Sequence, residues 1–315
     1  MSLKLRERTI EFLQIEPDKK FTARDIATWI FENYPDECEE KRLRSKAVVV
    51  PLNDTNAFIT QLVAEIGSNR PSLEKKHPEL KTTEGRPRKY YWSNQSDEDE
   101  VTNAEMEPTN NSTAEPTKSG YSERSLYPIL SQYLESELKV YGKRIDERRS
   151  SNTRGRGGNH WLYPDLVGME DLSKDWNSEI KQIVKQYADH KTKLWSFEIK
   201  KLVNLSNIRE VFFQAVSNSS WANYGYLVAA EFVGDKTLQE LRMLASLHGI
   251  GVIKLDIENP TESQILIPAK EKQNVDWDTA NRIAQQNKDF RDYIKLVRQF
   301  YQTGDVREKD WSVLP

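Results

Sequence analysis

The stretch LWSFEIKKLV, residues 194–203, places charged side chains inside an otherwise apolar segment. A short, mostly apolar run of this kind predicts a β-strand, in which successive side chains point to opposite faces of the sheet. Glu198 and Lys200 therefore share one face, while Phe197 and Ile199 share the other and can fill a core. A buried charge is costly unless it is paired or bound to a metal, so this acid and ammonium predict a chemical site.

A second predicted strand, WLYPDLVGM at residues 161–169, contains Asp165 directly after a proline. If the two strands pair, Asp165 lies beside Glu198, which gives two carboxylates next to Lys200. Two hard oxygen ligands with open coordination positions suit Mg²⁺, for which Mn²⁺ could substitute. The metal would activate a water, and Lys200 would act as catalytic base or stabilise the transition state. The expected reaction is hydrolysis of a phosphodiester bond.

Helical periodicity and short apolar runs alternate through this half of the chain. They predict helices at about residues 123–138, 178–187, 207–219 and 236–248, and further strands at residues 139–145, 224–232 and 249–257. This order predicts an α/β (α+β) fold with one mixed sheet flanked by helices. Residues 276–301 carry one more helical pattern, which predicts an appended helical region.

The first 93 residues carry a different pattern. Apolar stripes predict helices at residues 5–14, 22–34 and 53–66, the last ending at Gly67. The segment LKTTEGRPRKYYW, residues 80–92, alternates around Gly85 and Pro87 and predicts a two-stranded hairpin. Three helices followed by a hairpin is the order of a winged helix-turn-helix.

Basic residues gather around this hairpin and in the loop RGRGG, residues 154–158. Such clusters contact the phosphates of double-stranded DNA without reading its sequence. The alternative is that they are solvated surface charges. The predicted DNA contacts are Arg70, Lys75, Lys76, Arg86, Arg88, Lys89, Arg154 and Arg156.

The net charge of −3 over 315 residues hides one acidic segment, because residues 96–119 hold one Lys against seven Asp and Glu. A segment this polar predicts a flexible linker. The expected division is a winged-helix domain at 1–93, an acidic linker at 94–120, a catalytic domain at 121–270 and a helical extension at 271–315. A lone Cys38 excludes an intrachain disulfide, and without a membrane-spanning stretch or signal segment we expect a cytoplasmic protein.

Pro164 and Asp165, followed after a spacer by Glu198 and Lys200, resemble the motif of the PD-(D/E)xK superfamily of restriction-endonuclease-like nucleases. The order of predicted elements from residue 121 to 257 is similar to the core of that family. The resemblance implies a metal-dependent DNA endonuclease of restriction or phage-defence type, with Asp165 and Glu198 as metal ligands and Lys200 as a catalytic residue.

The same resemblance implies two further site residues. The family often adds a glutamate from its first helix, for which Glu123 is preferred over Glu137. It also often adds a polar residue from the second helix, where Gln214 matches, although a half-buried helix glutamine is an equal alternative.

The N-terminal region, closing with TEGRPRKYYW at residues 83–92, resembles the HARE-HTH class of winged helices. The two-domain layout is similar to HrgA-like restriction endonuclease proteins, from which the segment at residues 35–51 departs. A homodimer is expected if both DNA strands are cut. The alternatives are a non-catalytic DNA-binding regulator with a nuclease-like scaffold and a nuclease that acts on RNA.

Overall fold

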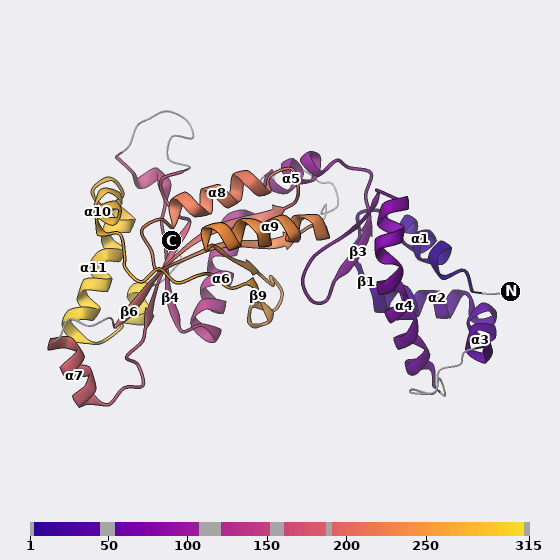
Figure 1. Ribbon diagram of the computed structural model, residues 1–315, viewed down its shortest axis with the longest axis horizontal. Helices are drawn as coiled ribbons and strands as arrows, with labels where there is room; N and C mark the ends of the chain where they lie inside the picture. The colour runs from indigo at the N-terminus through magenta and orange to yellow at the C-terminus, as the bar shows by residue number, and fades with distance from the viewer. Residues whose placement is uncertain (1–2, 45–53, 107–120, 152–160, 187–190, 312–315) are drawn as a thin grey trace. The chain divides into compact units, whose positions relative to one another are not determined.

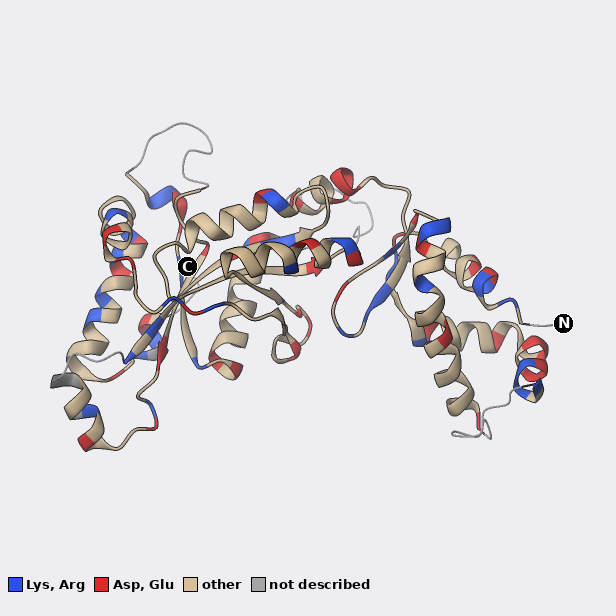
Figure 2. Ribbon diagram, viewed as in Figure 1, with Lys and Arg blue, Asp and Glu red and all other residues tan. Residues whose placement is uncertain are grey.

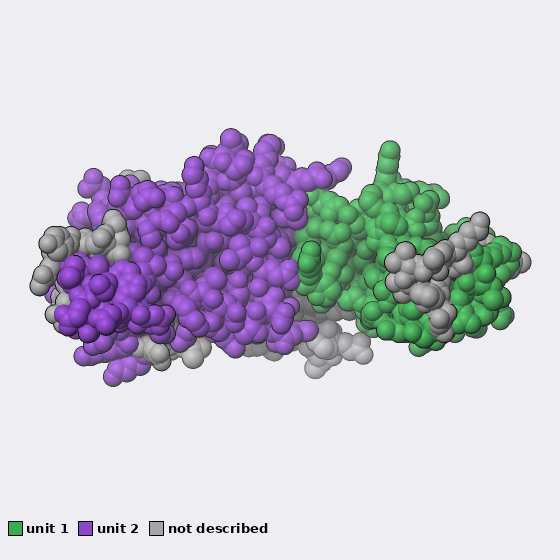
Figure 3. Space-filling view, turned by 60° about the horizontal axis from the view of Figure 1, so that its bottom comes forward, with its two compact units in different colours: residues 1–99, 233–235 green, residues 100–232, 236–315 purple. Residues whose placement is uncertain are grey.

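The computed structural model describes residues 3–44, 54–106, 121–151, 161–186 and 191–311. The chain divides into two compact units, which we call unit 1 and unit 2 (Figure 3). Unit 1 comprises residues 1–99 and 233–235, and unit 2 comprises residues 100–232 and 236–315. Within the described ranges, no helix is long and apolar enough to cross a membrane.

Unit 1 combines helices with a three-stranded antiparallel sheet of order β1-β3-β2 (Figure 1). Thr22 begins the second helix with a capping box, in which its hydroxyl accepts from the Asp25 N–H. The apolar sides of α1, α2 and α4 pack with β2 and β3 in one core. The elements are α1 (Leu5–Ile15), β1 (Phe21–Thr22), α2 (Ala23–Asn33), α3 (Pro35–Arg44), α4 (Thr55–Lys76), β2 (Leu80–Thr82) and β3 (Lys89–Trp92).

The hairpin predicted at residues 80–92 is confirmed, but the predicted end of the third helix is wrong. The α4 helix passes through Gly67 and continues to Lys76. One glycine costs a helix only about 1 kcal/mol. Leu73, beyond the glycine, is buried in the core of unit 1, so tertiary packing carries the helix onward.

Part of the predicted linker is also helical, because α5 (Asp97–Glu105) lies within residues 94–120. Ser96 precedes this helix, and its hydroxyl accepts from the Asp99 N–H at 3.1 Å. The acidic run, red in Figure 2, occupies the first turn, where negative side chains favour a helix dipole. Val101 is buried. The flexible-linker prediction is therefore wrong for α5, and residues 107–120 lie outside the described ranges.

Unit 2 is a mixed sheet with helices, as predicted, and its strand order is β4-β5-β6-β7-β8-β9. Strands β6, β7 and β8 are parallel, and the other neighbouring pairs are antiparallel. Strand β9 was not among the predicted strands. The elements are α6 (Glu123–Glu137), β4 (Val140–Arg144), β5 (Leu166–Asp171), α7 (Ser178–Gln186), β6 (Thr192–Val203), α8 (Ile208–Asn218), β7 (Tyr224–Phe232), α9 (Asp235–His248), β8 (Gly251–Lys254), β9 (Gln264–Ile267), α10 (Trp277–Gln286) and α11 (Lys288–Thr303).

Apolar clusters bind these elements together. Phe197 and Ile199 pack with the buried side of α6, as the alternation along β6 predicts. A second cluster joins α8 and α9 to β7 and β8. The C-terminal helices are not an appendage, because Phe290 and Tyr293 of α11 share a cluster with Val167 of β5. The predicted single helical region is two helices, since the Asn287 side chain caps α11.

Candidate active site

The predicted charged residues lie where β5 begins beside β6. Strand β5 pairs antiparallel with β6 from Leu166, opposite Phe197, so Asp165 is level with Glu198. The Asp165 N–H donates to the Phe197 carbonyl at 3.2 Å. Next along β6, the Ile199 N–H donates to Asp165 Oδ2 at 2.7 Å. The expected pairing of these two strands is therefore confirmed. The Asp165 carboxylate accepts the backbone N–H of Ile199, just beyond the end of the β5–β6 ladder.

Glu198 is buried, with 1% of its surface exposed, and both its oxygens are engaged. Oε1 accepts from Lys200 Nζ at 2.7 Å, and Oε2 accepts from Asn218 Nδ2 at 2.8 Å. Burial raises the pKa of Glu198 well above its ordinary value, and the charge of Asp165 adds to this, while Lys200 and Asn218 oppose it. The site therefore holds negative charge in a position where water stabilises it poorly.

Lys200 is the cation inside this group. Its burial alone would lower its pKa, but the carboxylates of Glu198, Asp165 and Glu123 together raise it above the ordinary value. Lys200 is therefore an ammonium at neutral pH, hydrogen-bonded to Glu198.

The first helix of unit 2 brings a third carboxylate to the site. Tyr127 of α6 places its Oη 3.4 Å from Glu123 Oε1 and 3.4 Å from Asp165 Oδ1, so it links the two acids. Burial, followed by the charge of Asp165, raises the pKa of Glu123 to about 7. Glu137, the alternative at the other end of α6, is exposed. Of the two glutamates, Glu123 is the one beside Asp165.

The α8 side chain that contacts Glu198 is Asn218, which sequence reasoning missed. Gln214, the predicted residue, is buried one helical turn earlier on the same side of α8. The Asn218 Oδ1 is itself buried and accepts no hydrogen bond within the described part of the chain. The spacing of four residues from Gln214 was the only signal in the sequence that could have indicated Asn218.

The donor chemistry of Asp165 and Glu198 fits a divalent cation, although the described residues contain no group of three or more His, Cys, Asp or Glu side chains arranged around a metal position. Mg²⁺ is commonly held by one or two carboxylates and keeps several waters. Burial first, and then the charge of Asp165, raises the pKa of both Glu198 and Glu123, and a bound cation would favour their charged forms. A two-carboxylate Mg²⁺ or Mn²⁺ site therefore fits these residues.

The predicted DNA contacts divide into two groups. Arg70 is buried and forms ion pairs with Glu74 and Asp235, and Arg88 pairs with Glu84 at 2.7 Å and with Asp235 at 3.2 Å. Both guanidinium groups are engaged by carboxylates, and that of Arg70 is also buried, which counts against those two assignments. The local count of basic residues missed Asp235 because it is remote in sequence. Exposed side chains are those of Lys75, Lys76, Arg86 and Lys89, and Arg154 and Arg156 lie outside the described residues.

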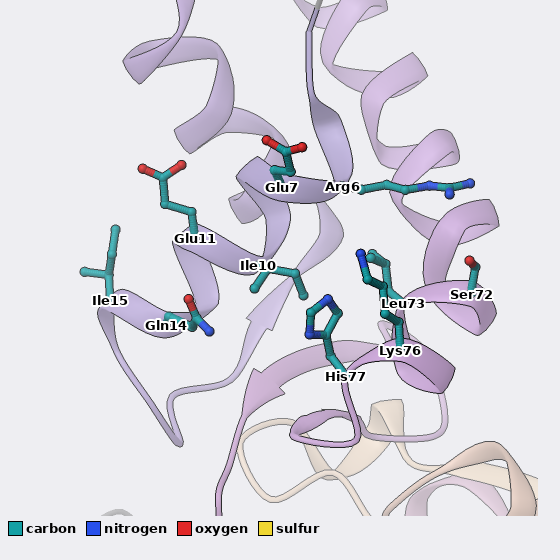
Figure 4. Close-up of a pocket in the computed structure, with 10 residues that line it drawn as sticks. All are labelled: Arg6, Glu7, Ile10, Glu11, Gln14, Ile15, Ser72, Leu73, Lys76 and His77. Carbon is teal, nitrogen blue, oxygen red and sulfur yellow. The ribbon is translucent and has the colours of Figure 1, made fainter.

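Unit 1 also contains a pocket of about 490 Å³ between α1 and the end of α4 (Figure 4). Ile10 and Leu73 supply apolar surface, and the pocket is lined by both acidic side chains, Glu7 and Glu11, and basic side chains, Arg6 and Lys76. A lining with charges of both signs favours no single class of ligand.

Comparison with known proteins adds nothing to these residues: no protein-family model, curated protein or solved structure matches the chain. What the site can do is inferred from its own chemistry. It places the carboxylates of Asp165 and Glu198, which fit a two-carboxylate cation site, beside Glu123 and the ammonium of Lys200, which can stabilise an anionic transition state.

Proposed function

We propose that the chain is a metal-dependent DNA endonuclease of restriction or phage-defence type, which hydrolyses phosphodiester bonds at the Asp165, Glu198 and Lys200 site. The observation that carries the proposal is the buried Glu198–Lys200 pair beside Asp165. A buried ion pair adds little to stability, and apolar residues of similar size often serve as well. Perturbed charges gathered in this way are typical of functional sites.

Each residue has a distinct role in this proposal. Asp165 and Glu198 hold Mg²⁺ or Mn²⁺, which when bound supplies an activated water and offsets charge on the phosphate. Lys200, kept as an ammonium by its acidic neighbours, donates to the developing negative charge and is not the base. Glu123, with a pKa of about 7, accepts a proton near neutral pH. Asn218 fixes the orientation of the Glu198 carboxylate.

The element order of unit 2 supports a restriction-endonuclease-like fold. Helix α6 is followed by the antiparallel strands β4, β5 and β6, then by α8 and the parallel strand β7. This is the order of helix, motif-bearing strands, second helix and further strand that the PD-(D/E)xK resemblance implies. The resemblance rests on this order and on four motif residues.

The architecture of unit 1 supports a winged helix that targets duplex DNA. The short β1, between α1 and α2, pairs with β3, so the hairpin predicted as the wing is part of a three-stranded sheet. The exposed basic residues Lys75, Lys76, Arg86 and Lys89 remain the proposed phosphate contacts. A homodimer is proposed for cutting both strands, because one site severs one strand.

Cleavage of supercoiled plasmid in Mg²⁺ or Mn²⁺ tests the proposal, with wild type, Lys200→Ala and the exposed-lysine control Lys288→Ala. We expect nicked or linear products from wild type and control, and a rate lower by roughly 100-fold or more for Lys200→Ala. Equal cutting by wild type and Lys200→Ala would remove the assignment. A wild type that binds plasmid without cutting it would favour the non-catalytic regulator, and cutting of RNA alone would change the substrate class.

A further inference from the structure

Arg144 ends β4, the edge strand next to β5, and lies beside the proposed active site. In the β4–β5 register it is opposite Leu166, the residue that follows Asp165. The next residue along the chain, Ile145, donates its N–H to the Asp165 carbonyl at 3.0 Å. The backbone of β4 thus reaches the same level of the sheet as the Asp165 and Glu198 carboxylates.

The Arg144 guanidinium lies over the ring of Tyr127, with 5.1 Å between its central carbon and the ring centroid. Tyr127 is the same side chain whose Oη is 3.4 Å from Asp165 Oδ1 and from Glu123 Oε1. A cation held against an aromatic face keeps the donors on the edge of its plane available. One tyrosine therefore connects the acidic group of the site to a positioned arginine.

This arginine is not committed to a carboxylate. Among the described residues, the Arg144 side chain has no ion pair and no hydrogen bond, and its Nε is buried without an acceptor. Arg70, Arg88 and Arg149 are different, since each is paired with Asp or Glu. The Arg144 guanidinium is therefore not neutralised by a carboxylate of the described residues, and its charge is available to an anionic ligand that supplies acceptor oxygens.

We propose that Arg144 binds a phosphate of the DNA strand that is cut, an inference that rests on the proposed nuclease function. Three carboxylates in one site repel a polyanion, and Lys200, the ammonium that the described residues place among them, is already hydrogen-bonded to Glu198. Beside the metal that Asp165 and Glu198 would hold, a positioned cation at the edge of the site would help to draw a phosphodiester towards these acids. A planar guanidinium suits this task because it can donate two parallel hydrogen bonds to phosphate oxygens.

Binding of a fluorescein-labelled DNA duplex, followed by anisotropy over a range of salt concentrations, tests the proposal in the full chain. Ca²⁺ replaces Mg²⁺, so that the carboxylates are offset while its less strict coordination geometry disfavours hydrolysis. The variants are Arg144→Met and Arg144→Lys, with Arg242→Met, an exposed arginine on α9, as the charge-matched control. Unchanged circular dichroism establishes that each variant folds.

Affinity for DNA falls as salt rises, and the loss of one phosphate contact makes the plot of log affinity against log salt less steep by about 0.9. This change corresponds to roughly eightfold weaker binding at ~0.1 M salt. We expect this change for Arg144→Met but not for Arg242→Met. Arg144→Lys keeps the charge without the fork of donors, so its slope is expected to be near that of wild type while its affinity is lower.

An Arg144→Met variant that matches Arg242→Met in affinity and slope would overturn the inference, as would a wild type that does not bind duplex DNA. The two proposals fail separately. If Arg144→Met weakens binding but wild type leaves plasmid uncut in Mg²⁺, the phosphate contact stands and the nuclease function falls. If wild type cuts plasmid and Arg144→Met binds and cuts equally well, the nuclease function stands and the Arg144 inference falls.

Discussion

Replacement of Lys200 by methionine leaves Glu198 buried without its cation. Removal of one partner from a buried ion pair typically costs about 3 to 5 kcal/mol, because the remaining charge is uncompensated. Here Glu198 keeps its 2.8 Å bond from Asn218, and its pKa is already raised, so it can take up a proton. Both features limit the destabilisation. At pH 8 we therefore expect the free energy of unfolding of unit 2 to decrease by about 3 kcal/mol.

The sign of the pH dependence follows from the same group. Without Lys200 the folded-state pKa of Glu198 rises further above the unfolded value of 4.5, so the folded protein binds a proton that the unfolded chain releases. Stability of Lys200→Met therefore decreases as the pH rises above about 4.5, and its deficit against wild type is smaller at pH 5 than at pH 8. The double variant Glu198→Gln/Lys200→Met lacks both charges and should lie within about 1 to 2 kcal/mol of wild type.

Hydrogen exchange of the β6 backbone amides is a suitable measurement, because the most buried strand of a unit exchanges through its global unfolding. The exposed-lysine variant Lys288→Met controls for loss of a positive charge. The reasoning is refuted if Lys200→Met exchanges as slowly as wild type at pH 8. It is also refuted if the double variant loses the sum of the two single losses, because coupled charges must show non-additive effects.

Three further predictions concern neighbouring contacts. Asn218→Ala removes the donor to Glu198 Oε2, so the cleavage rate should fall by roughly ten- to 100-fold, and an unchanged rate would remove Asn218 from the site. Because the pKa of Glu123 is about 7 in the folded protein, this group should make the free energy of unfolding fall as the pH rises from about 4.5 to 7. In Glu123→Gln the urea midpoint should therefore depend less steeply on pH over this range. An equally steep pH dependence would contradict the raised pKa of Glu123. Tyr293→Phe loses the 2.8 Å bond to the buried Gly168 carbonyl and should cost about 1 to 2 kcal/mol in urea unfolding, whereas no change would mean that this bond does not hold α11 to the sheet.

Local periodicity was sufficient to predict much of unit 2. The alternation of Phe197 and Ile199 with Glu198 and Lys200 indicated both the strand and its buried side. The position of Asp165 depended on a strand pairing that the sequence could only suggest, and the register shows it level with Glu198. Features that depend on residues close together in the sequence could thus be predicted from the sequence alone.

What the sequence could not indicate depends on contacts between distant residues. Asp235 neutralises Arg70 and Arg88, so a local excess of basic residues misrepresented how many are exposed. Asn218 and Arg144 become relevant only when α8 and β4 are placed next to the Asp165 and Glu198 strands. The α5 helix was missed because its acids were interpreted as a sign of disorder, although they occupy a helix N-terminus.

Calorimetric titration of Mg²⁺ and Mn²⁺ into the full chain most directly tests whether Asp165 and Glu198 form a metal centre. The comparison is between wild type, the double variant Asp165→Asn/Glu198→Gln and the control Asp292→Asn, whose carboxylate pairs with Lys295 on the exposed side of α11. We expect one divalent-cation site in wild type and control, and its loss in the double variant, because the ligand charges are gone while the side-chain shapes remain. Equal metal binding by wild type and the double variant, or no binding by a folded wild type, would contradict the proposed metal-dependent nuclease site.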